Sequence, residues 1–266
     1  MLRRATGFRF SRLVRGRGRT RDWTGIPELA HLRDVDVFVW CGGKCGGSTL
    51  RATFEAAGLK VLHTHGPFHF AKDVVRRDDV DLFEVFDFNA RTKARVLVVD
   101  AYRLPIERKI SSFFQNLETH VPGHRGLSLA ELMAVFDEKF LEILEVHHPI
   151  DRIMRHRGVP WFDSFDFERG YVLARDDGVE FLKLRFADVA DWGRILSGVV
   201  GRPIAMRDAN RTETKPVNEL YRHFLASYRL PRGFLERHVE GDRHFRIHTT
   251  EEERTAYLRD WRARTR

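Results

Sequence analysis

The chain has 266 residues and a formal net charge of +8, with 42% hydrophobic and 32% charged residues. This composition indicates a globular protein that buries a core without disulfides or a structural metal, and it excludes a largely disordered chain. Residues 1–21 contain eight arginines and no acid, so the remaining chain has 38 basic and 38 acidic residues and is formally neutral. We therefore expect no nucleic-acid binding by the folded part, because that function is typical of a basic folded face.

The same sequence gives expectations about location and domain organisation. No apolar stretch has the length of a transmembrane helix, and the basic amino terminus lacks the apolar region of a secretory signal. Cys41 and Cys45 cannot form a disulfide framework, so we expect a reducing, cytoplasmic location. Residues 1–25 are predicted to be a flexible basic arm, and residues 26–266 a single α/β domain. A peripheral contact of the arm with an anionic membrane surface stays open.

Apolar runs of strand length alternate with helical patterns along the chain. Strands are predicted at residues 35–41, 60–63 and 95–101, and a hairpin at 171–175 and 179–186. Helices are predicted at residues 48–57, 105–118, 127–146, 187–200, 216–227, 231–238 and 250–264. This order predicts a P-loop-like, three-layer α/β/α fold with a mainly parallel central sheet and a helical C-terminal part.

A glycine-rich turn joins the first predicted strand to the first predicted helix, where residues 41–50 read CGGKCGGSTL. Glycines let backbone N–H groups face an anion, and a helix N-terminus adds positive potential, so this turn predicts an anion-binding loop. Gly42 and Gly47 have the separation found in the Walker A loop, but Ser48 stands where that loop has lysine. Without this lysine, a P-loop kinase or NTPase lacks its ligand to the β- and γ-phosphates and is only an alternative.

The order of Lys44, Gly46, Ser48 and Thr49 resembles the 5′-phosphosulfate loop of sulfotransferases. These enzymes use 3′-phosphoadenosine 5′-phosphosulfate (PAPS). The resemblance implies that Lys44 lies against the phosphosulfate and that Ser48 and Thr49 bind the 5′-phosphate, with the backbone of Gly46 and Gly47 beside them. The residue before the lysine is glycine here, where the family usually has proline. For this loop taken alone, a structural turn with a solvated lysine is the alternative.

A second cluster follows the strand predicted at residues 95–101. Arg103 stands at the carboxyl end of this strand, where open α/β sheets bind ligands, and Ser111 lies two turns into the next predicted helix. The two can share one phosphate only if that helix packs alongside; a salt-bridged arginine and a surface serine are the alternative. Arginine, then x-proline, with a serine eight positions after the arginine resembles the 3′-phosphate motif of sulfotransferases. Residues 103–114 are especially similar to carbohydrate sulfotransferases.

Two histidines and a late basic segment extend the resemblance. His63-Thr64-His65 is similar to the His-x-His of heparan sulfate 2-O-sulfotransferases, and two residues this far apart on a strand share one face. Histidine suits a general base near pH 7, and the resemblance implies that His65 is the base, with His63 as its neighbour or as second candidate. Residues 210–215 resemble the basic segment near the cofactor, which implies that Arg211 and Lys215 assist.

The resemblance covers roughly residues 35–262 and includes a bacterial family described as capsular polysaccharide synthesis proteins, in the sulfotransferase clan. It implies PAPS-dependent transfer of a sulfuryl group to a carbohydrate hydroxyl by in-line displacement, with Lys44 stabilising the leaving group and adenosine 3′,5′-bisphosphate as product. We expect no metal, since the spacing of Cys41 and Cys45 fits no common site and the sequence shows no compact ligand set. A non-catalytic module that binds polyanions is the further alternative.

Overall fold

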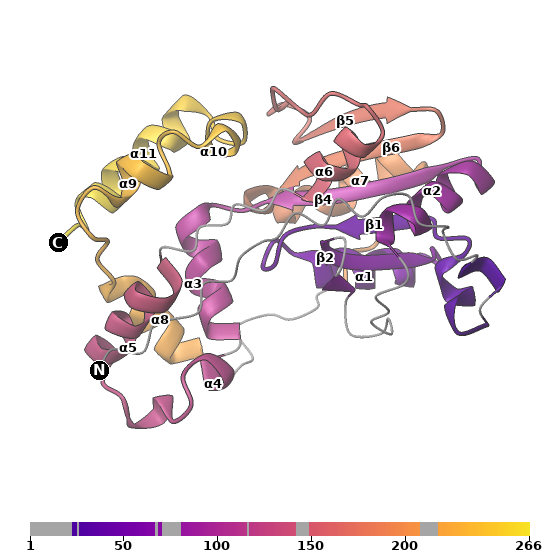
Figure 1. The fold of residues 1–266 in the computed structure, drawn as a ribbon. Helices are drawn as coiled ribbons and strands as arrows, with labels where there is room; N and C mark the ends of the chain where they lie inside the picture. The colour runs from indigo at the N-terminus through magenta and orange to yellow at the C-terminus, as the bar shows by residue number, and fades with distance from the viewer. Residues whose placement is uncertain are drawn as a thin grey trace.

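The computed structural model describes residues 23–25, 27–66, 69–70, 81–115, 117–141, 149–207 and 218–266. A six-stranded sheet with the order β3-β2-β1-β4-β6-β5 forms its centre (Figure 1). The strands are β1 (Val37–Trp40), β2 (Val61–Gly66), β3 (His69–Phe70), β4 (Val96–Tyr102), β5 (Tyr171–Asp176) and β6 (Val179–Arg185). Neighbours among β1, β2, β4 and β6 pair in parallel, while β3 and β5 are antiparallel edge strands.

Helices cover both faces of the sheet and make it the middle of three layers. Helices α2 (Leu82–Thr92) and α6 (Pro149–His156) pack on one face, against Phe38 of β1 and Phe181 of β6. Helices α1 (Gly47–Ala56) and α7 (Trp192–Val200) pack on the other face. Every residue of β4 is buried, as expected for a central parallel strand covered on both faces. The predicted α/β/α fold with a mainly parallel sheet is confirmed.

The remaining helices gather around a third core, beyond the carboxyl end of β4 (Figure 1). They are α3 (Pro105–Gln115), α4 (Leu117–His120), α5 (Leu129–Phe136), α8 (Asn218–Ser227), α9 (Phe234–His238), α10 (Arg243–Ile247) and α11 (Glu251–Arg262). Phenylalanines dominate this core, and Phe113, Phe136 and Phe224 meet one another with ring centroids 5.3–6.0 Å apart. The predicted helical C-terminal part is therefore present and has its own apolar core.

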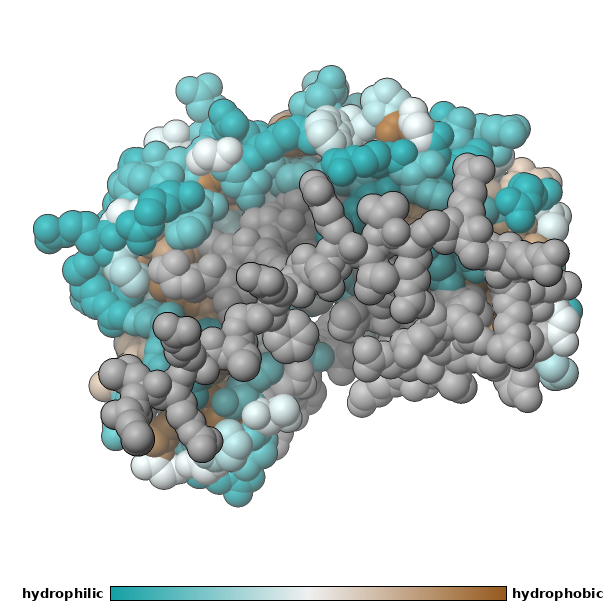
Figure 2. Space-filling view, viewed as in Figure 1, coloured by the Kyte–Doolittle hydropathy of each residue, from teal (hydrophilic) through white to brown (hydrophobic). Residues whose placement is uncertain are grey.

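Short helical segments complete the described chain. They are η1 (Trp23–Gly25), η2 (Pro27–Leu32), η3 (His124–Gly126), η4 (Asp137–Leu141) and η5 (Phe186–Asp191). None of the helices in the described ranges has the length and apolar character needed to cross a membrane. The described surface on the face drawn in Figure 2 is mostly hydrophilic, with hydrophobic colour confined to small patches.

Two of the differences between the predicted and observed element boundaries concern candidate residues or a long predicted helix. Strand β2 extends to Gly66, three residues beyond its predicted end at His63, so His65 also lies within the strand. The helix predicted for residues 127–146 ends its α-helical part at Phe136, where a π turn over Asp137–Leu141 follows. Its α-helical part begins at Leu129, where Ser128 and Glu131 form a capping box that satisfies the first backbone N–H groups. The predicted arm over residues 1–25 lies almost entirely outside the described residues.

Candidate functional site

The glycine-rich loop leaves β1 in an unusual backbone conformation. Lys44 has φ 68° and Gly46 has φ 89°, both in the left-handed region. A Cβ on Gly46 would lie 2.7 Å from the ring of Trp192, so both the conformation and the close packing require glycine. Left-handed residues just before a helix turn backbone N–H groups toward one point, which is an anion-binding arrangement. The positive φ of Lys44 is strain of the kind that is concentrated at binding sites.

Helix α1 begins at Gly47, directly against β2. A Cβ on Gly47 would lie 2.3 Å from Nε2 of His63 and 2.5 Å from Sγ of Cys41, so any larger residue would push the helix away from the sheet. Ser48 and Thr49 follow in the first turn of α1, and both are half-buried. The close approach therefore holds the N-terminus of α1, its two hydroxyl residues and Lys44 together at the carboxyl edge of the sheet.

Arg103 connects this loop to α3. Its Nη1 donates to the main-chain oxygen of Lys44 at 3.0 Å and to Oγ of Ser111 at 3.3 Å. The guanidinium also lies 4.6 Å from the ring centroid of Phe186. Ser111 is buried, with an exposed fraction of 6%. Helix α3 thus packs alongside the loop, and the two predicted cofactor clusters lie in direct contact.

The partners of Arg103 are uncharged. Besides the Lys44 carbonyl and the Ser111 hydroxyl, Arg103 hydrogen-bonds to Tyr221 on α8, a contact that acts against the burial which raises the pKa of this phenol. Within the described ranges, Arg103 forms no ion pair with a carboxylate. Its positive charge is therefore not neutralised by these parts of the chain, and an anionic ligand could neutralise it.

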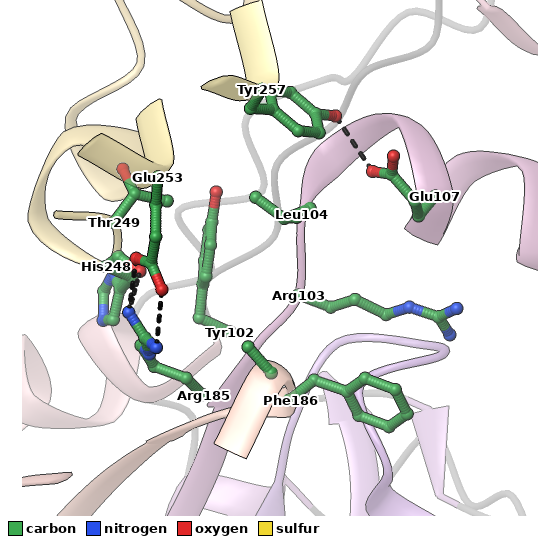
Figure 3. A pocket seen from close by; sticks show the side chains of 11 residues that line it. Tyr102, Arg103, Leu104, Glu107, Arg185, Phe186, His248, Thr249, Glu253 and Tyr257 are labelled. Carbon is green, nitrogen blue, oxygen red and sulfur yellow. Dashed lines mark hydrogen bonds and ion pairs between the residues drawn. The ribbon is translucent and has the colours of Figure 1, made fainter. Parts of the chain in front are cut away.

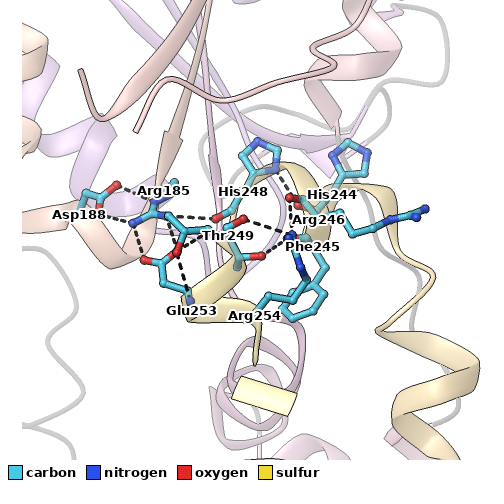
Figure 4. Close-up of polar contacts among 10 residues, drawn as sticks. Arg185, Asp188, His244, Phe245, Arg246, His248, Thr249, Glu253 and Arg254 are labelled. Atoms are coloured by element: carbon cyan, nitrogen blue, oxygen red, sulfur yellow. Dashed lines mark hydrogen bonds and ion pairs between the residues drawn. The ribbon is translucent and has the colours of Figure 1, made fainter. Parts of the chain in front are cut away.

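The neighbouring arginine at the end of β6 has the opposite environment. Arg185 binds Asp188 and Glu253 through hydrogen bonds of 2.7–3.0 Å (Figure 4). Burial lowers the pKa of Arg185, but hydrogen bonds to these two carboxylates outweigh burial and raise it overall. The main-chain oxygen of His248 accepts a further hydrogen bond from it. Arg185 thus ties the end of the sheet to α11 and is not available to an anion.

A cavity of about 430 Å³ opens between the ends of β4 and β6 and the helices of the third core (Figure 3). Its lining comprises Tyr102, Arg103, Leu104, Glu107, Arg185, Phe186, Ala187, His248, Thr249, Glu253 and Tyr257. Tyr102 stacks on His248 with ring centroids 4.7 Å apart, and Tyr257 donates to Glu107 at 2.9 Å. Aromatic rings therefore line one concave site, which suits a flat ring, and Arg103 and Glu107 place one positive and one negative charge beside it.

The two histidines on β2 have different surroundings. His63 is buried, and burial first, then His65 and Arg51, lowers its pKa to about 3, so its imidazole is neutral. His65 is exposed, and its Nδ1 donates to the main-chain oxygen of Cys41 at 2.9 Å. A carbonyl only accepts, so Nδ1 carries a proton in this contact, and in the neutral form of the ring the lone pair is on Nε2. The ring centroids are 4.8 Å apart, which agrees with the predicted common face of the strand.

The two cysteines are both free and buried. Burial raises the pKa of both thiols, that of Cys41 well above its ordinary value. The Sγ of Cys41 lies 3.9 Å from Nε2 of His63. Cys41 thus belongs to a group with the two histidines, which the separation of the cysteines in the sequence did not show.

Several predicted residues are brought together and others lie outside the described ranges. The structure places Lys44, Gly46, Gly47, Ser48, Thr49, His63, His65, Arg103 and Ser111 at one edge of the sheet. Arg211 and Lys215 fall within residues 208–217, which the structure does not describe. Sequence reasoning missed Phe186 and Tyr221, the ring and hydroxyl partners of Arg103. Comparison with protein-family models, with curated proteins and with solved structures finds no match to this chain.

Proposed function

We propose that the protein is a PAPS-dependent sulfotransferase that transfers a sulfuryl group to a hydroxyl of a carbohydrate. The observation that carries this proposal is the position of Arg103 between the glycine loop and Ser111. Within the described residues, the hydrogen-bond partners of Arg103 are uncharged. A site of this kind suits a ligand with two separate anionic groups, one at the N-terminus of α1 and one at Arg103. The resemblance of both segments to sulfotransferase motifs supports the same ligand.

Each part of the donor substrate has a candidate binding group. The N-terminus of α1, with Gly46, Gly47, Ser48 and Thr49, would hold the 5′-phosphate through backbone N–H groups and hydroxyls. Arg103 and Ser111 would hold the 3′-phosphate. The aromatic walls of the neighbouring cavity suit the nucleobase. Arg211 and Lys215 are proposed to assist from the late basic segment.

The proposed chemistry needs positioning, charge stabilisation and one base. A bond forms between the acceptor oxygen and sulfur while the bond from sulfur to the phosphate oxygen breaks. His65 accepts the acceptor proton at Nε2, because the Cys41 carbonyl keeps the other proton on Nδ1. Lys44 stabilises the negative charge that develops on the leaving oxygen. His63 is buried and neutral, so it supports His65 and is the weaker candidate for the base.

Binding of adenosine 3′,5′-bisphosphate tests the nucleotide site by calorimetry. We expect a clear preference over adenosine 5′-phosphate, and a loss of at least about tenfold in affinity for Lys44→Ala and for Arg103→Ala, as typical of contacts to charged groups. Arg194→Ala is the matched control, because this arginine is exposed on α7 and its ion pair within the described residues is a 3.7 Å contact with Asp191. Binding of Mg-ATP without preference for a 3′-phosphate would instead indicate a P-loop kinase or NTPase.

Turnover tests the reaction itself. PAPS incubated with carbohydrate acceptors should yield adenosine 3′,5′-bisphosphate and a sulfated sugar, and His65→Gln should remove this turnover while nucleotide affinity stays. Nucleotide or polyanion binding with no transfer to any acceptor would support the non-catalytic alternative. Absence of nucleotide binding in the parent protein would overturn the proposal.

A further inference from the structure

Three side chains with metal-binding atoms lie together at the carboxyl edge of β1 and β2. Cys41 follows β1, and His63 and His65 lie on β2, which pairs with β1 in parallel register. One ligand atom from each residue lies within 4.8 Å of the others. The Sγ of Cys41 and the Nε2 of His63 are 3.9 Å apart. A tetrahedral zinc ion with its usual bond lengths holds sulfur and nitrogen about 3.6 Å apart, so a shift of a few tenths of an ångström would complete this pair.

Backbone contacts already hold the three side chains in position. Cys41 is fully buried and its thiol is in no disulfide, while His63 is fixed by the strand pairing of Val39 with it. The main-chain oxygen of Cys41 accepts from Nδ1 of His65, and metal-binding histidines usually have such a carbonyl contact on one ring nitrogen. Cys41 and His63 are therefore ordered before an ion binds, whereas the exposed ring of His65 would move closer by about 1 Å to reach zinc.

The donor set selects the kind of ion. One thiol and two imidazoles suit Zn²⁺, whereas Mg²⁺ and Ca²⁺ prefer oxygen ligands. His65 is exposed while Cys41 and His63 are buried, so the open coordination position would face the solvent side of the site. We propose that Cys41, His63 and His65 form a three-ligand zinc site, in which the thiol of Cys41 binds as thiolate and releases its proton to solvent.

Zinc at this site would have a consequence that rests on the proposed function. Coordination by His65 occupies the ring that is proposed to accept the acceptor proton, so the zinc-bound protein would be inactive in sulfuryl transfer. The nucleotide contacts of Arg103 and Ser111 do not involve these three residues and should be unchanged. Zinc is thereby an inhibitor of transfer that does not compete with adenosine 3′,5′-bisphosphate.

Cobalt spectroscopy tests the site without any substrate. The full chain is stripped with a chelator and titrated with Co²⁺, which gives a thiolate-to-metal charge-transfer band only when sulfur binds. We expect one equivalent of Co²⁺ to produce this band, and Zn²⁺ to displace it. Because the chain has only two cysteines, Cys41→Ser should remove the band while the matched variant Cys45→Ser keeps it.

The histidine variants keep the test decisive if Cys41→Ser fails to fold. His65 is exposed, so His65→Ala should lower the unfolding temperature of the metal-free chain only slightly, through the lost hydrogen bond to Cys41, while Zn²⁺ affinity falls at least about tenfold, as for lost metal contacts. No charge-transfer band, or a band that depends on Cys45, would overturn the proposal. Zinc binding without sulfuryl transfer would refute only the proposed function, and transfer insensitive to zinc with no cobalt band would refute only this site.

Discussion

Two halves of the same sheet edge hold their polar side chains in opposite ways. On the β4–β6 half, Lys183 pairs with Asp100 and Arg185 pairs with Asp188 and Glu253, so charges meet opposite charges. On the β1–β2 half, the thiol of Cys41 and the neutral imidazole of His63 pack against Gly47, at the start of α1. Arg103 stands between the halves with uncharged described partners. A charge that is already paired within the fold is not available to a ligand, whereas a cation with uncharged partners remains able to bind an anion.

The largest expected effect on the free energy of unfolding comes from the β4–β6 half. Arg185→Ala should lower the free energy of unfolding by about 3 kcal/mol, because it removes a buried guanidinium together with its hydrogen bonds to the carboxylates of Asp188 and Glu253. Asp188 on η5 loses its ion-pair partner, and α11 loses the contact that Glu253 makes with the end of β6. Urea-induced unfolding measures this loss, and Arg194→Ala serves as the exposed control. A loss below about 1 kcal/mol would show that the network contributes no more than surface pairs do.

The second effect concerns the glycine loop of the β1–β2 half. Gly47→Ala should lower the free energy of unfolding by about 2 kcal/mol, because its Cβ would overlap the His63 and Cys41 side chains. Gly43→Ala is the matched control in the same loop, since nothing lies within 4 Å of its added Cβ. Its unfolding free energy should change by less than about 0.5 kcal/mol, as for open surface positions. Equal losses in thermal unfolding would contradict the close approach of α1 to β2.

Acid should destabilise the β1–β2 half through protonation of His63. Burial, His65 and Arg51 lower its pKa to about 3, so below its ordinary value of 6.5 the unfolded chain binds a proton that the folded chain does not. Stability therefore falls as the pH is lowered from about 6.5 toward 3, by about 1.5 kcal/mol per buried histidine between pH 6.5 and 5. Unfolding free energies of His63→Gln and of the parent across this range measure the share of His63.

On the β4–β6 half, His248 is a second buried histidine that titrates in this way. Burial, and next the charge of Lys183, lower its pKa well below the ordinary value, so it adds to the acid sensitivity with the same sign. His63→Gln should therefore reduce the pH dependence and not remove it. An unchanged pH dependence in His63→Gln would mean that His63 titrates normally in the folded protein.

The sequence predicted those features that depend on local patterns. The continuous apolar run of β4 and the turn at residues 176–178 indicated a central strand and a hairpin, and both are present. Helices α2 and α6 escaped prediction although Asp81 caps α2 and Pro149 begins α6. Both are short amphipathic segments whose apolar residues are stabilised by packing on the sheet, and propensity alone does not make such segments stand out.

The candidate site was predictable only where its residues are near one another in the sequence. Lys44 and Ser48 share a loop, and Arg103 and Ser111 lie two helical turns apart, so their spacing carried the hypothesis. The contact of Cys41 with His63 depends on the register between β1 and β2, and that of Arg103 with Tyr221 on how α8 packs. Strand register and helix packing are determined by the whole core, so local sequence patterns could not predict these two contacts.

The smallest expected effect on stability tests Arg103 itself. Arg103→Ala should lower the free energy of unfolding by about 1 kcal/mol, because hydrogen bonds to neutral partners contribute little net stability. Adenosine 3′,5′-bisphosphate in excess should raise the unfolding temperature of the parent and of Arg194→Ala, and should raise that of Arg103→Ala by less, since stabilisation by a ligand falls with its affinity for the folded state. A loss for Arg103→Ala as large as that for Arg185→Ala, with ligand stabilisation intact, would mean that both arginines are structural.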